Sequence, residues 1–292
     1  MKSLNDNKAS INWFPGHMTK AKRKIAEQIK LVDLVAEVVD ARIPFSSRNP
    51  DIPELIGDKP HIILLNKCDM ADNRLTLEWV EHYKRQSITA IVVDCKSGKG
   101  VNDFKTAVMS VLSDKLKIYE EKGMSGKPLR VMILGIPNVG KSSFINRLAG
   151  KSKAKVENRP GVTKGNQWFT VDKKLELLDT PGVLWPKFES QTVGEHLALT
   201  GAVTDRILDT ELLAMRLLDI LKEKYMQLLS ARYNIESLPD DSYESLCVLG
   251  KKRGMVVRGG EVDTLRAANM LLEEFRNCKI GRITLEGTGF YA

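Results

Sequence analysis

The chain has 292 residues, of which 42% are hydrophobic and 28% charged, a balance typical of a folded protein with one large or two smaller domains. No apolar run approaches the roughly 18 residues of a membrane-spanning helix, and the first residues lack the apolar core of a signal peptide. The four cysteines stand far apart without a Cys-x-x-Cys pair. This argues against a zinc site or disulfide framework and favours a reduced, cytoplasmic protein.

The formal net charge of +8 is spread unevenly. Lysine and arginine dominate residues 1–30 and 141–174, whereas acidic residues dominate 209–250. A basic surface is typical of proteins with a polyanionic partner, although an ordinary solvated surface would give the same counts.

Strands and helices are predicted to alternate over the first two thirds of the chain. The predicted strands are 34–42, 61–69, the start of 88–100, 129–135 and a hairpin at 167–180; the predicted helices are 18–33, 75–86, 101–123 and 142–150. Such alternation predicts an α/β fold with a mostly parallel sheet and helices on both faces.

The alternation ends near residue 205. Apolar residues then recur at helical spacing in 210–229 and again in 262–277. We therefore expect an α/β domain over residues 1–205 and a smaller all-α domain over 206–292.

The segment "GIPNVGKSS" (Gly135–Ser143) fits G-x-x-x-x-G-K-[ST] between a predicted strand and a predicted helix, the context that confirms a P-loop. Its backbone N–H groups and the helix N-terminus would cradle phosphates. Lys141 would reach the β- and γ-phosphates, and Ser142 would bind Mg²⁺. The expected nucleotide contacts are Asn138, Val139, Gly140, Lys141, Ser142 and Ser143.

Two later segments supply the elements that sense the γ-phosphate. In "LELLDTPG", Asp179 ends a predicted strand and could hold Mg²⁺ through water, and the N–H of Gly182 could meet the γ-phosphate. In "RPGVTKG", Thr163 is expected to bind Mg²⁺ only while the γ-phosphate is present; a plain loop is the alternative.

The segment "NKCD" (Asn66–Asp69) has the N-K-x-D pattern by which GTPases read guanine. Asn66 could bond the O6/N7 edge, the Lys67 stem could pack on the ring, and Asp69 could accept from N1–H and the 2-amino group. Adenine lacks those two donors and would be rejected. After the next strand, Cys95 and Lys96 match loosely the loop that supports the base.

N-K-x-D usually follows the P-loop, but here it precedes the P-loop by about seventy residues. Two tandem nucleotide domains would each need a P-loop, and the sequence has one. The order therefore indicates a circularly permuted Ras-like P-loop GTPase domain, in which helix 101–122 joins the natural termini.

The motifs "WFPGHM", "DARIPFSSRNP", "NKCD", "GIPNVGKSS", "RPGVTK", "LLDTPGVLWPKF", "GKKRG" and "CKIGRITLE" together resemble the YlqF/RbgA family of circularly permuted GTPases, the ribosome biogenesis GTPase A family. The resemblance implies a cytoplasmic GTPase that assists late assembly of the large ribosomal subunit and contacts ribosomal RNA through its helical domain. We expect a monomer with no membrane partner. The basic residues available for RNA phosphates are 251–253, Arg258, Arg276, Lys279 and Arg282.

Val183 stands where Ras-type enzymes carry the glutamine that orients the attacking water. The resemblance implies that His17 takes this role, for which imidazole is suited; a structural loop histidine is the alternative. The other histidines, His61, His82 and His196, are expected to be structural. Related GTPases use an asparagine at the position of Asn138 to help bind K⁺; a loop-stabilising role is the alternative.

The sequence is compatible with three functions. The first is an RNA-stimulated GTPase of a pre-ribosomal particle. The second is a ribosome-independent switch that acts on a protein effector or modifies tRNA, although no catalytic cysteine or added cofactor domain is visible. The third is a nucleotide-binding scaffold without turnover, which Val183 favours and Lys141, Ser142 and Asp179 oppose.

Overall fold

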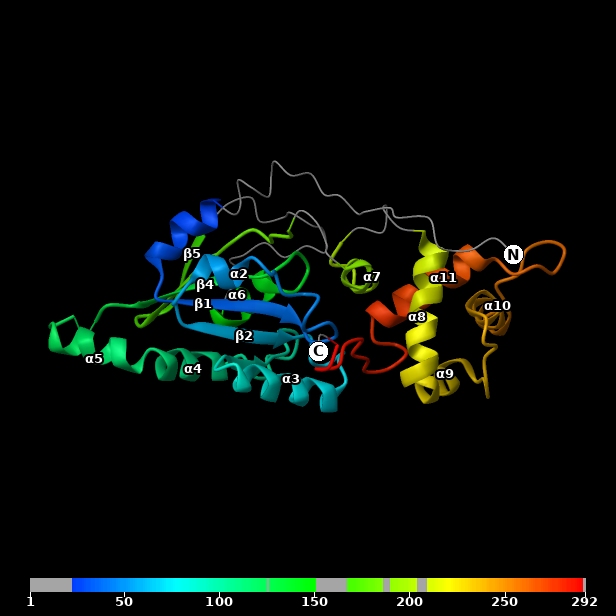
Figure 1. The fold of residues 1–292 in the computed structure, drawn as a ribbon, viewed down its shortest axis with the longest axis horizontal. Helices are drawn as coiled ribbons and strands as arrows, with labels where there is room; N and C mark the ends of the chain where they lie inside the picture. Colours follow the sequence, from blue (N-terminus) through cyan, green and yellow to red (C-terminus); the bar gives the residue numbers. More distant parts are fainter. Residues whose placement is uncertain (1–22, 125, 151–166, 186–189, 204–208, 291–292) are drawn as a thin grey trace.

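The computed structural model describes residues 23–124, 126–150, 167–185, 190–203 and 209–290. A sheet forms one end of the molecule and a group of helices forms the other (Figure 1). The strands are β1 (Leu34–Asp40), β2 (His61–Asn66), β3 (Thr89–Val92), β4 (Leu129–Leu134), β5 (Gln167–Asp172) and β6 (Leu175–Asp179). The helices are η1 (Ile29–Leu31), α2 (Ile52–Ile56), α3 (Asn73–Arg85), α4 (Asp103–Val111), α5 (Ser113–Glu121), α6 (Lys141–Leu148), α7 (Gln191–Leu199), α8 (Thr210–Lys224), α9 (Met226–Tyr233), α10 (Ser242–Lys252) and α11 (Thr264–Arg276).

The strands lie in the order β3-β2-β1-β4-β6-β5. β5 pairs antiparallel with β6, and every other pairing in this sheet is parallel. β4 leads to the P-loop and lies at the centre beside β1, although it is fourth in the chain. The predicted α/β fold with a permuted GTPase order is confirmed.

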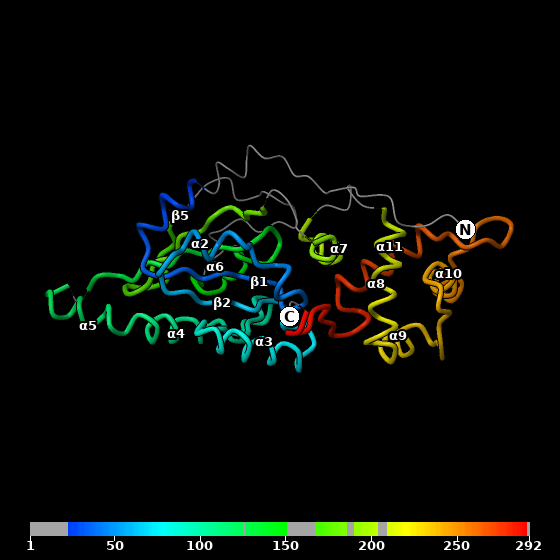
Figure 2. The backbone as a smooth tube through the Cα atoms, in the orientation of Figure 1, coloured from blue at the N-terminus to red at the C-terminus, as the bar shows by residue number. Residues whose placement is uncertain are grey.

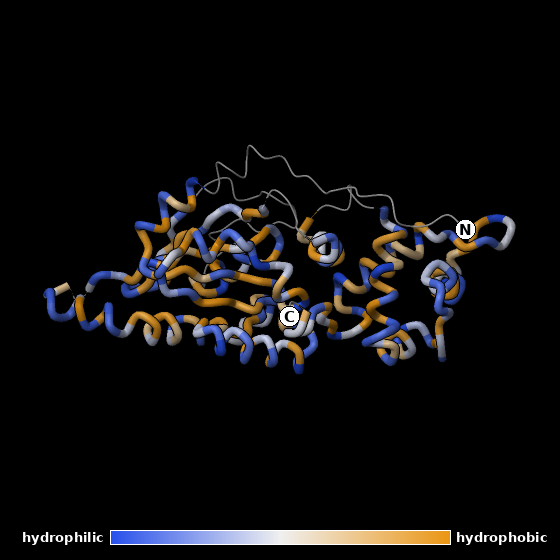
Figure 3. The backbone as a smooth tube through the Cα atoms, viewed as in Figure 1, coloured by the Kyte–Doolittle hydropathy of each residue, from blue (hydrophilic) through white to orange (hydrophobic). Residues whose placement is uncertain are grey.

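Helices cover both faces of the sheet because the central strands are apolar on both sides. On one face, Phe104 of α4 and Phe144 of α6 join the largest apolar cluster, and their rings meet edge to face at 5.0 Å. On the other face, Trp79 and Tyr83 of α3 pack with Ile63 of β2. Figure 3 shows the hydrophobic strands between more hydrophilic helices.

The structure differs from the predicted helices at two breaks. The predicted helix 101–123 is interrupted at Leu112, whose backbone lies at φ −102° and ψ 19°. The predicted helix 210–229 is interrupted at Tyr225, at φ −137° and ψ 27°. The predicted helix 18–33 is helical over 23–28 and then tightens into η1; its first residues lie outside the described part. Helices α2, α7 and α10 were not among the predicted elements.

In the helical part, α8 packs against α9, α10 and α11. Leu199 of α7, Leu217 of α8 and Phe275 of α11 belong to the same apolar cluster as the sheet residue Leu64, so the core is continuous between the two parts. The chain then returns, and its last described segment lies against the ends of the strands (Figure 2). Among the described residues, no helix is long and apolar enough to cross a membrane.

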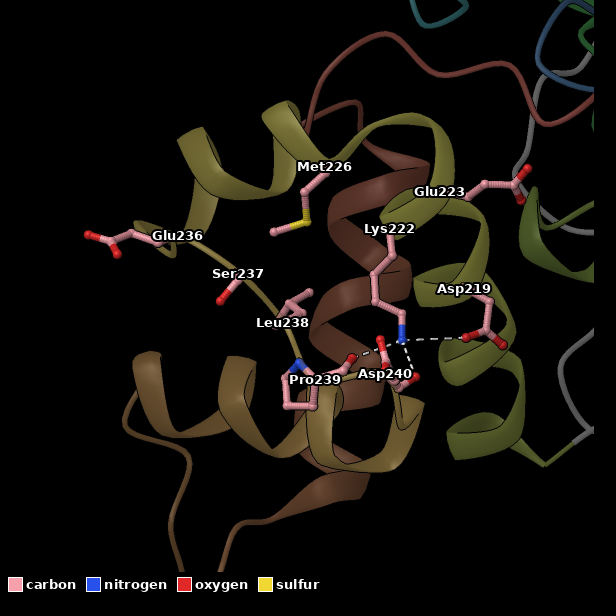
Figure 4. A pocket seen from close by; sticks show the side chains of 9 residues that line it. All are labelled: Asp219, Lys222, Glu223, Met226, Glu236, Ser237, Leu238, Pro239 and Asp240. Atoms are coloured by element: carbon pink, nitrogen blue, oxygen red, sulfur yellow. Dashed lines mark hydrogen bonds and ion pairs between the residues drawn. The ribbon is translucent and has the colours of Figure 1, made fainter.

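A hollow of about 500 Å³ lies between α8, α9 and the segment 236–240 (Figure 4). The Lys222 ammonium donates to the carbonyls of Pro239 and Asp240, at 3.2 and 2.7 Å, and lies 3.7 Å from the Asp219 carboxylate. Lys222 therefore braces this segment against α8, away from the sheet edge where the predicted nucleotide motifs gather.

Candidate functional site

The predicted nucleotide motifs within the described residues meet at one edge of the sheet, because each follows or ends a parallel strand. Asp40 ends β1, Asn66 ends β2, and Asp179 ends β6. The P-loop leaves the end of β4 and enters α6 at Lys141. Ligands of open α/β sheets bind at this edge, outside the carboxyl ends of the strands.

The P-loop turns into α6 through Gly140, which has φ 102°. A Cβ at this glycine would lie 2.3 Å from Nδ2 of Asn66, so any larger residue would displace the asparagine. Ser142 and Ser143 occupy the first turn of α6. The helix N-terminus therefore faces the sheet edge with the partial positive charge that phosphates require.

Lys141 and Asp179 form the charged centre of this site. The buried Lys141 ammonium donates to the carbonyl of Ile136 at 2.8 Å. Burial lowers the pKa of Lys141 to about 8, an effect that nearby Asp179 opposes. Burial likewise raises the pKa of Asp179 to about 6, against the effect of Lys141. Each charge is held only partly compensated, as in a site that receives charged ligands.

Asp179 also provides a test of fit for Mg²⁺. Its Oδ1 is buried and makes no hydrogen bond within the described part of the chain. Carboxylate and hydroxyl oxygens are the ligands that Mg²⁺ prefers, with phosphates and water completing the shell. Asp179 and Ser142 fit such an ion; when bound, it would neutralise charge on the phosphates.

Gly182 packs closely on the P-loop. A Cβ at Gly182 would lie 2.7 Å from the Pro137 nitrogen and 3.0 Å from Nζ of Lys141. The next residue, Val183, packs against an apolar cluster, and its carbonyl accepts from Asn49 Nδ2 at 3.2 Å. The position after Gly182 is therefore part of the packing and offers no group that could orient water.

Asn66 joins three motifs. Its Nδ2 donates to the carbonyl of Val139 in the P-loop at 2.7 Å, and its Oδ1 accepts from the N–H of Cys95 at 3.2 Å. An amide nitrogen carries two hydrogens, so a further bond to a base stays within its capacity. Asn66 thus fixes the N-K-x-D segment, the P-loop and the loop after β3 relative to one another.

The Lys67 ammonium pairs with Oδ2 of Asp40 at 2.9 Å. Arg42 holds both oxygens of the same carboxylate, at 2.9 and 2.7 Å. Although burial acts to raise the pKa of Asp40, the charges of Arg42 and Lys67 hold that pKa well below its ordinary value. Asp40 was not among the predicted site residues; its place at the end of a buried strand is the signal that could have found it.

The loop after β3 is ordered by Asp94, whose carboxylate accepts the N–H groups of Lys96 and Ser97 at 2.7 and 3.1 Å. Burial raises the pKa of the Cys95 thiol to about 12. Cys95 therefore acts through its backbone. Arg147 of α6 donates to the carbonyl of Ser97, which ties this loop to the P-loop helix.

Asn138 has φ 61°, and its Nδ2 donates to the carbonyl of Gly201 beyond α7 at 2.8 Å. This bond supports the loop-stabilising role, and the K⁺ role stays a prediction.

Two predicted catalytic residues, His17 and Thr163, lie outside the described residues. Among the other histidines, His196 is buried with Nδ1 2.7 Å from Oε1 of Glu286. His61 lies 3.3 Å from Glu37, and His82 on α3 contacts Gln86. None of these three adjoins the phosphate loop in a described contact.

Comparison with known proteins agrees with this geometry. Residues 130–235 match the family described as 50S ribosome-binding GTPase. Ribosome biogenesis GTPase A of Priestia megaterium (strain DSM 319 / IMG 1521) is 49% identical over 279 residues, which cover 95% of this chain and 96% of the relative. GDP-bound TM YlqF is 30% identical with a TM-score of 0.62, over 91% of this chain and 100% of that one. GNP-bound YlqF from T. maritima is 31% identical with a TM-score of 0.61, over 92% and 98%.

The similarities to these relatives and solved structures extend over nearly the whole chain, whereas the family model matches residues 130–235. The P-loop before α6, Asp179 at the end of β6 and the strand order are features of a permuted P-loop GTPase. The chain therefore belongs to the ribosome biogenesis GTPase A family, and it is a P-loop enzyme that hydrolyses GTP.

Proposed function

We propose that this GTPase acts as a monomer in the cytoplasm, where it binds the large ribosomal subunit and assists the late assembly of that subunit. Binding to the subunit would stimulate its GTP hydrolysis. The names of the relatives support the ribosomal partner. The observation that carries the stimulation is the packing of Val183, which leaves the position after Gly182 without a water-orienting side chain. Basal hydrolysis should then be slow, and the subunit would complete or order the catalytic arrangement.

We propose roles for the individual residues. Asn66 and Asp69 read guanine, with Lys67, Cys95 and Lys96 supporting the base. The backbone of 138–143 holds the phosphates, and Lys141 neutralises the β/γ oxygens. Ser142, Asp179 and, while the γ-phosphate is present, Thr163 would hold Mg²⁺; Asn138 would assist a K⁺ ion.

His17 is proposed to position the attacking water. An imidazole can accept a proton or fix a water near neutral pH, and Val183 can do neither. The contribution of His17 should therefore appear in the rate of GTP hydrolysis when the subunit is bound.

A GTPase assay with and without purified large subunits tests the proposal. We expect strong stimulation of the parent, and His17→Ala should lower the stimulated kcat roughly 10²-fold with nucleotide affinity near normal. His82→Ala, which removes a half-buried imidazole of α3 that contacts Gln86, is the control and should retain the parent rate. A His17→Ala enzyme with full stimulated kcat would remove His17 from the mechanism.

The same assay separates the competing functions. Turnover that is fast without subunits would support a ribosome-independent switch acting on a protein effector. Binding of GTP with no turnover under either condition would support a scaffold. Both outcomes would contradict the proposed stimulation.

A further inference from the structure

The segment Ile283–Glu286 is buried although it forms no helix or strand. Ile283, Thr284, Leu285 and Glu286 are each at most 2% exposed. Burial of an irregular backbone requires partners for its polar groups. Those partners identify what the segment does.

The partners lie in the loops that follow β1 and β2. The N–H of Ile283 donates to the carbonyl of Met70 at 3.0 Å, and the N–H of Leu285 donates to the carbonyl of Arg42 at 2.8 Å. The Thr284 hydroxyl accepts from the N–H of Asp72 at 3.0 Å and donates to the carbonyl of Ala41 at 3.3 Å. Residues 283–286 therefore connect the loops that follow β1 and β2, and they hold the chain on the C-terminal side of Asp69.

Glu286, the last residue of this segment, is also held by hydrogen bonds from the α/β part. The Glu286 carboxylate accepts from the N–H groups of Phe45 and Ser46 and lies 2.7 Å from Nδ1 of His196. The Glu286 carbonyl accepts from Nε1 of Trp79 on α3 at 3.0 Å. The segment is thus fixed on both sides of Thr284.

Thr284 also connects with the helical part. The Tyr225 hydroxyl donates to the Thr284 carbonyl at 2.9 Å and accepts from its N–H at 3.1 Å. Tyr225 stands at the break between α8 and α9. Thr284 therefore joins the helices, through its backbone, to Asp72, three residues after the guanine-reading segment, through its side chain.

We propose that Thr284 is a positioning residue for guanine recognition: with Tyr225, it fixes the segment Met70–Asp72 and so aims the Asp69 carboxylate at the base. The inference rests on the proposed role of Asp69. A carboxylate must be held within a fraction of an ångström to accept two donors at once, and such precision comes from residues packed behind the contact. Cys278 adds a weaker contact, its thiol lying 3.9 Å from the Asp69 carbonyl.

The test compares affinities for GDP and IDP, because inosine lacks the 2-amino group that Asp69 is proposed to bind. The parent should prefer GDP. Thr284→Val keeps the shape of the side chain and removes the hydroxyl. It should lower the ratio of the Kd for IDP to the Kd for GDP about fivefold or more, chiefly by weakening the binding of GDP. Tyr225→Phe should narrow it in the same direction and replaces Thr284→Val if that variant does not fold.

Ser245→Ala is the matched control. Its hydroxyl is fully buried in α10 and donates to the carbonyl of Pro239 at 2.8 Å, so its loss costs a comparable hydrogen bond far from the base. The control should lose stability and keep the parent ratio.

The outcomes separate the inference from the function on which it rests. Equal GDP and IDP affinities in the parent would defeat the reading of the 2-amino group by Asp69. If the parent prefers GDP while folded Thr284→Val, or Tyr225→Phe, keeps the parent ratio of Kd values, residues 283–286 only cover the ends of the strands, and the inference is overturned.

Discussion

At the scale of single residues, Asp69 is the residue proposed to recognise guanine. Asp69→Asn replaces a double acceptor with an amide that cannot accept from both guanine donors, so GTP affinity should fall sharply. Xanthine carries a 2-oxo group that the amide could meet, so xanthosine triphosphate should gain affinity. Titration of both nucleotides measures the change, with exposed Asp114→Asn on α5 as control. Unchanged GTP affinity in Asp69→Asn would show that the base is read elsewhere.

Lys141 is the second residue with a sharp prediction. Lys141→Ala removes a charge-assisted contact to the phosphates, worth about 1.5–3 kcal/mol, so GTP affinity or turnover should fall roughly tenfold or more. Lys117→Ala, on an exposed turn of α5, removes a like charge away from the site and should have little effect. Parent-like binding and turnover in Lys141→Ala would remove the ammonium from the phosphate site.

The sequence predicted the motif residues better than the hydrogen bonds that hold those residues in place. Lys141, Asp179 and Asn66 stand at one sheet edge because each motif follows or ends a parallel strand, and strand ends can be found from apolar patterns. The bonds from Asn66 to Val139 and Cys95 could not be predicted, because they join segments 73 and 29 residues apart. Such contacts depend on the folded register and leave no local pattern.

At the scale of elements, the missed helices and breaks have separate causes. Asp241 caps α10 at its N-terminus, where its carboxylate accepts from the N–H of Glu244; the sequence carries this capping signal, which could have found the helix. The break at Tyr225 has no such local signal. The Tyr225 hydroxyl donates to the Thr284 carbonyl at 2.9 Å, a tertiary contact that no local pattern predicts.

The helical part makes a pH-dependent prediction through Glu274 of α11. Its carboxylate accepts from Arg232 at 2.8 and 2.6 Å and from the Tyr233 hydroxyl at 2.9 Å. The bonds from Arg232, against the opposing effect of burial, lower the pKa of Glu274. A lowered pKa stabilises the fold above the unfolded value of about 4.3, and this contribution is lost as pH falls through the folded value.

Glu274→Gln should therefore reduce the free energy of unfolding by about 1–2 kcal/mol at pH 7, and the difference should shrink below about pH 4. Denaturant unfolding at several pH values measures it. Exposed Glu120→Gln on α5 is the control and should give a small, pH-independent change. A Glu274→Gln deficit that stays constant down to pH 3 would contradict the charged role of this residue.

At the scale of the whole molecule, the division into two domains near residue 205 remains a prediction. The structure shows in addition that the chain returns from the helical part to the sheet. Residues 283–286 lie beyond the helical part in sequence but are buried at the ends of β1 and β2. Arg276 of α11 also donates to the carbonyls of Ala198 and Leu199 at the end of α7. It is therefore less available for RNA phosphates than exposed Lys251, Arg258 and Lys279.

These connections suggest what the permutation accomplishes. The segment after Gly182 leads through α7 directly into the helices, and the P-loop residue Asn138 bonds to Gly201 at the far end of α7. In GTPases the γ-phosphate orders the switches and hydrolysis releases them. We expect this change to alter how the helical part meets the ribosome. A passive stabilising cap is the alternative.

The most direct measurement is the affinity of the intact protein for purified large subunits in the presence of a non-hydrolysable GTP analogue and of GDP. A truncation near residue 208 would also remove the buried 283–286 segment, so the full chain is used. We predict tight binding with the analogue, weaker binding with GDP, and a fall in both as salt rises. Equal affinities in the two nucleotide states would contradict the account.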